Sequence, residues 1–190
     1  MSDSKVIYDK ENIARLVLLI KKGDQNAFKQ FFTLFYSDIY RFLFNYLSNS
    51  NDAEDLCQET FIKFWLQRQN INSDSYPRAY LYKIAKNLAF NLTTRRPPSV
   101  SYDNDLKLIS LPGKDPQTEY ENLDLAVECR RVINQLPERC KMTFILSRYE
   151  GFDYSEIADT MEVSIQTVKN QMSKAISYLK EKLSAKMSLE

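Results

Sequence analysis

The stretch Asp52-Ala53-Glu54-Asp55-Leu56-Cys57-Gln58-Glu59-Thr60-Phe61-Ile62-Lys63-Phe64-Trp65 decides the fold, because it carries two patterns on one predicted helix. An apolar stripe recurs at helical spacing and must pack on a core. It consists of Ala53, Leu56, Cys57, Thr60, Phe61, Phe64 and Trp65. The opposite face is acidic with one aliphatic residue, and consists of Asp55, Gln58, Glu59 and Ile62. We expect Asn51 or Asp52 to cap this helix, whose acidic face can dock on a basic partner helix.

Helical periodicity continues on both sides of this stretch. Upstream, it predicts a short helix over residues 13–20 and a longer one over 24–47, capped by Asp24. Downstream, a polar loop over 69–75 precedes a fourth helix that starts at Pro77. These four helices form a predicted first module over residues 10–97.

A second helical module is predicted over residues 119–185, after a linker over 98–118 that contains three of the six prolines. One helix ends near Leu136, and Pro137 opens the next. Asp153 then begins a short helix with a capping-box pattern, and Ser164 caps the last helix. The fold class is therefore all-α, with a four-helix module and a helix-turn-helix module joined by a linker.

Composition excludes several classes of function. The 190 residues include no histidine and only three glycines, so histidine-based catalysis and glycine-rich phosphate loops are not expected. Cys57, Cys129 and Cys140 lack the spacing of a zinc site or a disulfide framework, and the first and second fall on apolar stripes that predict buried thiols. We expect no metal or cofactor. Without a signal peptide or a membrane-spanning run, a cytoplasmic protein with no membrane insertion is expected.

Charge is balanced overall at +1 but is unevenly distributed. Between Leu66 and Pro98 the only acidic residue is Asp74, whereas six residues are basic: Arg68, Arg78, Lys83, Lys86, Arg95 and Arg96. Tyr80, Tyr82 and Phe90 are interleaved with these. Basic groups can hold phosphates while aromatic rings stack on unpaired bases. A solvated amphipathic helix with its aromatic residues in the core is the alternative, and composition alone favours it.

Residues 154–175 have the form of a helix-turn-helix, in which a longer capped helix presents polar side chains to a major groove. The outward set consists of Ser164 at the cap, then Ile165, Gln166, Thr167, Lys169, Asn170, Ser173 and Lys174. Amides can pair with adenine edges, and lysines can reach guanine or phosphate. An ordinary helical hairpin is the alternative, but the Glu-Ile-Ala, Val-Ser and Thr-Val-Lys residues at these offsets favour DNA binding.

These motifs occur in the same order in the extracytoplasmic-function (ECF) group of bacterial RNA polymerase sigma factors, which the chain resembles from about Leu16 to Leu183. The stretch over 52–65 matches the core-polymerase motif of region 2.2. Residues 78–88 look like regions 2.3 and 2.4, while Leu136-Pro137-Glu138-Arg139 and residues 154–175 look like region 4. This chain departs from the family pattern at two positions. Family members commonly have arginine or histidine where this chain has Gln171, and a small or turn-forming residue where it has Glu162.

The resemblance implies a non-enzymatic function: directing core polymerase to specific promoters and initiating transcription. The implied partners are three. They are core polymerase, bound through its β′ clamp helices and β flap, then promoter DNA, and a membrane-associated anti-sigma factor. The clamp-binding residues would be Asp52, Asp55, Gln58, Glu59 and Ile62. Those for the single-stranded −10 element would be Arg78, Tyr82, Lys83, Lys86 and Asn87. Those for the duplex −35 element would be Ser164, Gln166, Thr167, Lys169, Asn170, Ser173 and Lys174.

Two other readings stay open. A stand-alone helix-turn-helix regulator would share the second module, but it predicts a β/α receiver or a ligand-binding module upstream. A small enzyme with a pair of catalytic carboxylates on the acidic helix lacks any accompanying pocket or metal-ligand signal.

Overall fold

The computed structural model describes residues 10–71, 77–95 and 127–187, and all regular structure in these ranges is helical. The predicted linker over 98–118 and part of the loop over 69–75 lie outside the described residues. In chain order the helices are α1 (Lys10–Lys21), α2 (Gln25–Leu47), α3 (Ser50–Leu66), the 3₁₀ turn η1 (Arg68–Asn70), α4 (Pro77–Arg95), a helical segment over 127–134, α6 (Glu138–Arg148), α7 (Tyr154–Met161) and α8 (Ile165–Met187). The all-α prediction is confirmed.

Local signals explain most helix boundaries. The Asp24 side chain accepts hydrogen bonds from the backbone N–H groups of Asn26 and Ala27, as predicted for the cap of α2. The capping box at the start of α7 is also present, with Asp153 and Glu156 bonded reciprocally. Ser164 Oγ accepts from the backbone of Thr167 at the start of α8.

The predicted cap of α3 was wrong. Neither Asn51 nor Asp52 caps it, because the helix begins at Ser50, before both of these residues. Asn49 is the cap, and its Oδ1 accepts from the Asp52 N–H at 2.9 Å. Ser48 has a left-handed backbone conformation that ends α2 and turns the chain toward Asn49. A second difference is η1, whose last two residues, 69 and 70, fall in the polar segment expected to be an irregular loop.

Aromatic side chains of α2 and α3 form the centre of the first module. Phe31 stacks on Phe64 with ring centroids 4.7 Å apart, and it also contacts Phe35 at 4.6 Å. All three are fully buried. Full burial of such a side chain contributes about 1.5–3 kcal/mol, so this cluster fixes α3 on α2.

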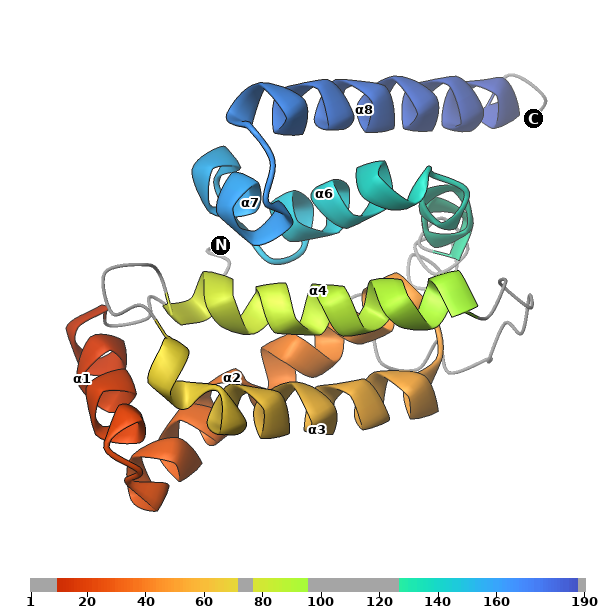
Figure 1. Cartoon of the computed structure of the whole chain (residues 1–190). Helices are drawn as coiled ribbons and strands as arrows, with labels where there is room; N and C mark the ends of the chain where they lie inside the picture. The colour runs from red at the N-terminus through yellow and green to blue at the C-terminus, as the bar shows by residue number, and fades with distance from the viewer. Residues whose placement is uncertain (1–9, 72–76, 96–126, 188–190) are drawn as a thin grey trace, which may run out of the picture.

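The two modules share one continuous core. Met142, Ile145 and Leu146 of α6 belong to the same buried cluster as the aromatic residues of α2. In Figure 1, α4 runs between α3 on one side and α6 and α7 on the other. The second module therefore lies directly on the basic helix of the first.

Candidate functional site

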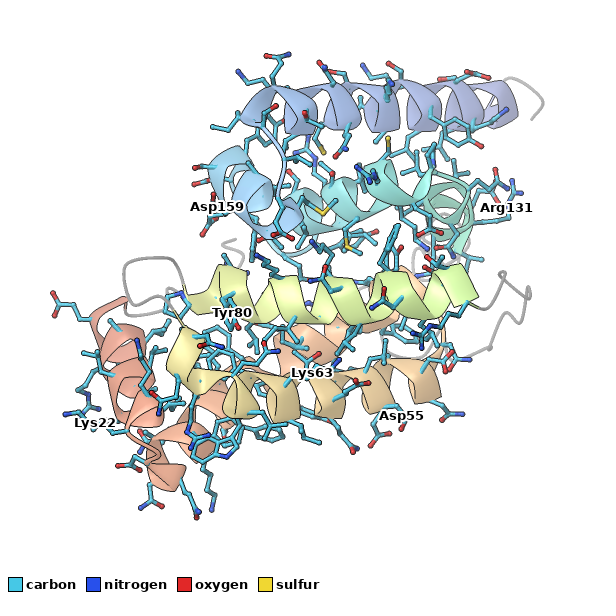
Figure 2. All side chains as sticks on the ribbon, in the orientation of Figure 1. Lys22, Asp55, Lys63, Tyr80, Arg131 and Asp159 are labelled. Atoms are coloured by element: carbon cyan, nitrogen blue, oxygen red, sulfur yellow. The ribbon has the colours of Figure 1, made fainter. Side chains whose placement is uncertain are left out.

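The outer face of α3 is open along its length. Asp55 and Gln58 are exposed, Glu59 is partly exposed, and 58% of the Ile62 surface is accessible. Asp55 projects from α3 away from α4 (Figure 2). The predicted inner stripe is buried from Ala53 to Phe64, with Trp65 half-buried at its end.

Leu66 extends this face and was missed in the sequence prediction. It is 68% exposed and follows Ile62 by four residues, so the two aliphatic side chains lie on one side of α3. Glu59 pairs with Lys63 at 3.0 Å. Such an exposed pair contributes little stability, so a partner can displace it at small cost.

The basic face of α4 is partly covered by the second module, in contrast to α3; Arg78 and Lys83 are half-buried. Tyr82 is fully buried and Lys86 is 9% exposed, whereas Asn87 is exposed. Lys86 Nζ donates to the Thr160 carbonyl at 3.0 Å. Burial lowers the pKa of Lys86, although Glu162 partly opposes this effect. The aromatic residues interleaved with the basic ones differ in burial: Tyr82 lies in the core, whereas 41% of the Phe90 surface is accessible.

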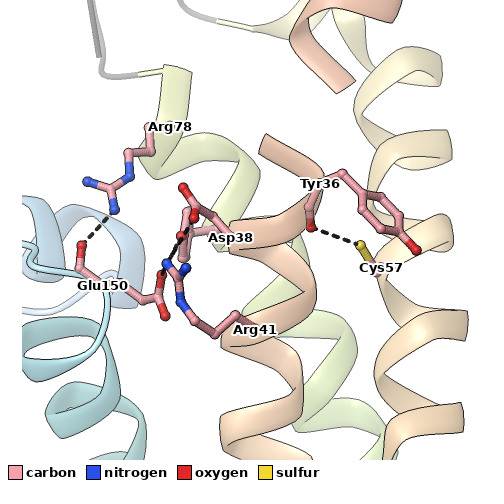
Figure 3. A network of polar contacts seen from close by, with 7 residues as sticks. Tyr36, Asp38, Arg41, Cys57, Arg78 and Glu150 are labelled. Atoms are coloured by element: carbon pink, nitrogen blue, oxygen red, sulfur yellow. Dashed lines mark hydrogen bonds and ion pairs between the residues drawn. The ribbon is translucent and has the colours of Figure 1, made fainter. Parts of the chain in front are cut away.

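Glu150, which follows α6, is the centre of a polar network between the modules (Figure 3). Its carboxylate accepts hydrogen bonds from Tyr82 Oη at 2.8 Å and from Arg41 Nη2 at 3.1 Å. Its backbone carbonyl accepts from Arg78 Nη2 at 2.7 Å. Burial raises the pKa of Glu150, and the Arg41 guanidinium opposes this shift. Arg41 also pairs with Asp38 at 2.9 Å.

Glu162 makes a second, more exposed contact with α4. Its carboxylate lies 2.8 Å from Lys83 Nζ and 3.7 Å from Lys86 Nζ. The hydrogen bond from Lys83 lowers the pKa of Glu162. Glu162 adopts φ 58°, a left-handed conformation that is unfavourable for a residue with a Cβ and suits the small or turn-forming residues common at this position in the family.

A third set of contacts joins the other end of the interface. Lys141 Nζ donates to the Tyr46 carbonyl at 2.6 Å, and the Tyr46 hydroxyl bonds to Glu138. Arg130 donates to Asn45 at 3.1 Å and covers the Phe44 ring. Glu138 belongs to the region 4 motif, but none of these contacts was predicted from the sequence. Glu150 carried one weak signal, because a carboxylate at a helix C-terminus opposes the helix dipole and needs another partner.

The outward face of α8 is accessible as predicted. Its exposed members are Ser164, Ile165, Gln166, Lys169, Asn170, Ser173 and Lys174, and Thr167 is partly exposed. Gln166 donates to Asn170 at 3.1 Å, so the two amides are aligned along one side of the helix. This surface can enter a groove without any movement of the second module.

Gln171 does not belong to that face. It is 9% exposed, and its side-chain carbonyl accepts from Thr143 Oγ1 of α6 at 2.6 Å. The departure from the family pattern at this position is therefore accommodated by a buried hydrogen bond between α6 and α8.

All three cysteines are free thiols. Cys57 is buried as predicted, whereas Cys129, also predicted to be buried, is only half-buried, and Cys140 is buried. Burial raises the pKa of Cys57 to about 12, and its sulfur lies 3.8 Å from the Tyr36 carbonyl. It is therefore an unreactive packing residue. Within the described ranges, no group of three or more potential metal ligands is found, and no helix has the length and apolar character needed to cross a membrane.

Comparison with known proteins agrees with this arrangement. Residues 31–96 match the family model for Sigma-70 region 2, and residues 127–179 match that for Sigma-70, region 4. The ECF RNA polymerase sigma-E factors of Salmonella typhimurium and Escherichia coli are each 33% identical, covering 84% of this chain and 88% of theirs. ECF RNA polymerase sigma factor SigW of Bacillus subtilis is 24% identical over 90% of this chain and 96% of its own.

Two solved structures share the fold. CnrH in complex with the cytosolic domain of CnrY superposes with a TM-score of 0.70 at 18% identity, covering 92% of this chain and 98% of CnrH. The sigma factor RpoE in complex with the anti-sigma factor NepR from Bartonella quintana gives a TM-score of 0.63 at 22% identity. The match covers 83% of this chain and 96% of RpoE. With both sigma regions matched in order and close relatives aligned over most of their length, the chain belongs to the ECF RNA polymerase sigma factors.

Proposed function

We propose that this sigma factor docks on core RNA polymerase through the outer face of α3 and reads promoters with α4 and α8. The chain directs polymerase to specific promoters and supports initiation, and we assign no catalytic chemistry to it. The proposed extents are residues 10–97 for region 2, 98–118 for the linker and 119–185 for region 4. A cytoplasmic location, without membrane insertion, follows from the same role.

The observation that carries the proposal is the open face of α3. Asp55 and Glu59 supply negative charge, and Ile62 with Leu66, about one helical turn apart, supply exposed aliphatic surface. Aliphatic side chains this exposed on an otherwise well-packed helix favour an interaction surface. The combination fits a basic helical partner, as expected of the β′ clamp helices. Asp52 and Gln58 complete the proposed contact.

The DNA-reading roles are assigned by chemistry. On α4, the cations Arg78, Lys83 and Lys86 would hold phosphates of the single-stranded −10 element, while Tyr82 and Asn87 would meet its bases. On α8, lysines would contact phosphate or guanine, and Gln166 and Asn170 would contact adenine. Thr167, Ser164 and Ser173 would complete the −35 contact, and the polymerase β flap would support region 4.

Control by an anti-sigma factor is also proposed, with a membrane-associated partner as the expected type. RpoE of Bartonella quintana was solved with the anti-sigma factor NepR, and CnrH with the cytosolic domain of CnrY. The shared fold supports an equivalent partner for this chain. A stand-alone regulator is disfavoured, because residues 31–96 match a sigma region rather than a receiver module.

The test is binding of the labelled full chain to bacterial core polymerase near physiological salt. The Asp55→Lys/Glu59→Lys variant is compared with Glu11→Lys/Glu181→Lys, which makes the same change in net charge on α1 and α8. We expect tight binding by the wild type and the control, and loss of binding in the α3 variant. Equal binding by all three proteins would contradict the assigned face. Tight duplex DNA binding without affinity for polymerase would favour the regulator.

A further inference from the structure

Arg130 is a half-buried cation that lacks a counter-ion. It lies in the helical segment over 127–134, where its guanidinium covers the Phe44 ring at 5.1 Å and donates to Asn45 Oδ1 at 3.1 Å. Among the described residues, no carboxylate pairs with it. Burial lowers the pKa of Arg130, as expected for a charge that is removed from water without an ionic partner.

The adjacent Arg131 shows the opposite arrangement in the same segment. Its Nε and Nη2 donate to the two carboxylate oxygens of Glu128 at 2.9 and 2.7 Å. Arg131 is exposed, whereas Arg130 is packed against α2. The paired arginine is therefore the hydrated one and the unpaired arginine is the desolvated one, which is the costlier arrangement for the chain by itself.

The neighbouring charges do not supply the missing partner. Arg130 is close enough to Lys141 to lower the pKa of that lysine, and Glu138 is the acidic group that opposes the shift. Glu138 is also bonded to the Tyr46 hydroxyl. Two cations thus share one carboxylate, so an anion from outside the chain would lower the electrostatic free energy at Arg130.

Aromatic rings from both modules flank this cation. Tyr149, the C-cap of α6, is 44% exposed and meets the Phe144 ring edge-on at 6.5 Å. Its hydroxyl is close enough to Arg130 for each group to affect the pKa of the other. On α2, the half-buried Tyr40 stacks on Phe44 with ring centroids 6.2 Å apart. We name Tyr40, Phe44, Arg130, Phe144 and Tyr149 the junction patch.

The chemistry of the junction patch fits a protein partner better than a nucleic acid. A guanidinium binds a carboxylate with two parallel hydrogen bonds, and tyrosine and arginine are the residue types enriched where interfaces gain most of their affinity. A nucleic-acid strand would instead need several accessible cations in line for successive phosphates. Lys141 cannot serve as one, because it is only 8% exposed and donates to the Tyr46 carbonyl.

We propose that the junction patch binds an acidic segment of a partner protein, with a carboxylate on Arg130 and an apolar side chain against Tyr40 and Tyr149. Because α2 and the second module each supply part of the patch, such a partner would recognise the two modules together. The patch contains none of the residues assigned to polymerase or DNA binding, so this inference goes beyond the proposed function.

The experiment compares the full-length wild type with Arg130→Met and Arg131→Met. Methionine keeps an unbranched apolar chain over Phe44 and removes the charge, and Arg131→Met makes the same change at the adjacent, paired position. Fluorescence anisotropy reports affinity for a fluorescein-labelled copolymer of glutamate and tyrosine. Labelled polyglutamate and a DNA single strand of about 12 nucleotides are the comparison probes.

We expect the copolymer to bind Arg130→Met about tenfold more weakly than the wild type, because its carboxylate loses a desolvated partner, and to bind Arg131→Met as it binds the wild type. Tyr149→Ala should weaken binding of the copolymer but not of polyglutamate. Equal affinity of all these proteins for the copolymer would overturn the proposal. A loss in Arg130→Met confined to the DNA strand would overturn it in favour of a nucleic-acid site.

Urea unfolding separates a binding cation from a structural one. If Arg130 is kept for a ligand, Arg130→Met should unfold at a urea concentration equal to or above that of the wild type, since the substitution removes an unpaired desolvated charge. A lower midpoint would mean that Arg130 holds α2 to the second module, and this result would overturn the proposal.

Discussion

At the scale of single residues, Lys141 shows how burial at the module interface changes ionisation. Its side chain is 8% exposed, and Nζ lies 4.9 Å from the Tyr46 ring centre as well as bonding the Tyr46 carbonyl. Burial lowers the pKa of Lys141 from 10.5 to about 8. Between these values the unfolded chain retains a proton that the folded chain has released. The free energy of unfolding therefore rises with pH in this window.

We predict that this contribution disappears in Lys141→Met. The free energy of unfolding of the wild type, relative to the variant, should rise from about pH 8 to about pH 10, by at most ~1.4 kcal/mol per pH unit for one proton. Urea titrations of both proteins at matched ionic strength provide the measurement. If the unfolding free energies of the wild type and the variant change in parallel with pH, the Lys141 ammonium group is not desolvated by folding.

Gln171 provides a second residue-scale prediction. Gln171→Leu should destabilise the protein by about 1–3 kcal/mol, because it leaves the buried Thr143 hydroxyl without its acceptor. Thr143→Val in the same chain removes that hydroxyl and should restore part of the loss. The unfolding free energies of the wild type, the two single variants and the double variant together form a double-mutant cycle. Additive losses would mean that the two side chains do not act as a pair.

At the scale of helices, the sequence predicted the faces of α3 well, because periodicity alone separates a buried stripe from an exposed one. It did not predict the cap. Residues 48–52 read Ser-Asn-Ser-Asn-Asp, and every one of them is a good N-cap. The choice of Asn49 depends on the left-handed turn at Ser48, which is set by how α2 and α3 meet.

Asn49→Ala should therefore loosen the start of α3. The expected loss is about 1 kcal/mol of unfolding free energy, whereas Asn49→Ser keeps an acceptor and should retain most of it. Thermal or urea unfolding of the two variants checks this. Because Asp52 and Asp55 lie in the first turns of α3, Asn49→Ala should also weaken core polymerase binding. Identical stability of both variants would remove Asn49 from its capping role.

At the scale of the whole molecule, the sequence predicted two helical modules but not their arrangement. The composition of α4 left two readings open, and the structure shows that burial of its aromatic residues depends on the second module. Tyr82 is a core residue, as in an ordinary amphipathic helix, but the residues that bury it include Phe152 from the other module. Such contacts join residues about 70 positions apart, and local patterns carry no information about pairs so distant.

We propose that docking through α3 is what allows this chain to give core polymerase its promoter specificity, and one measurement tests this dependence most directly. Core polymerase would transcribe genomic DNA of the source organism with the wild-type chain, with Asp55→Lys/Glu59→Lys, or alone, and the RNA 5′ ends would be mapped. We predict a set of start sites that share two upstream elements, present with the wild type and absent with the variant and with core polymerase alone. The same start sites in all three reactions would contradict the account.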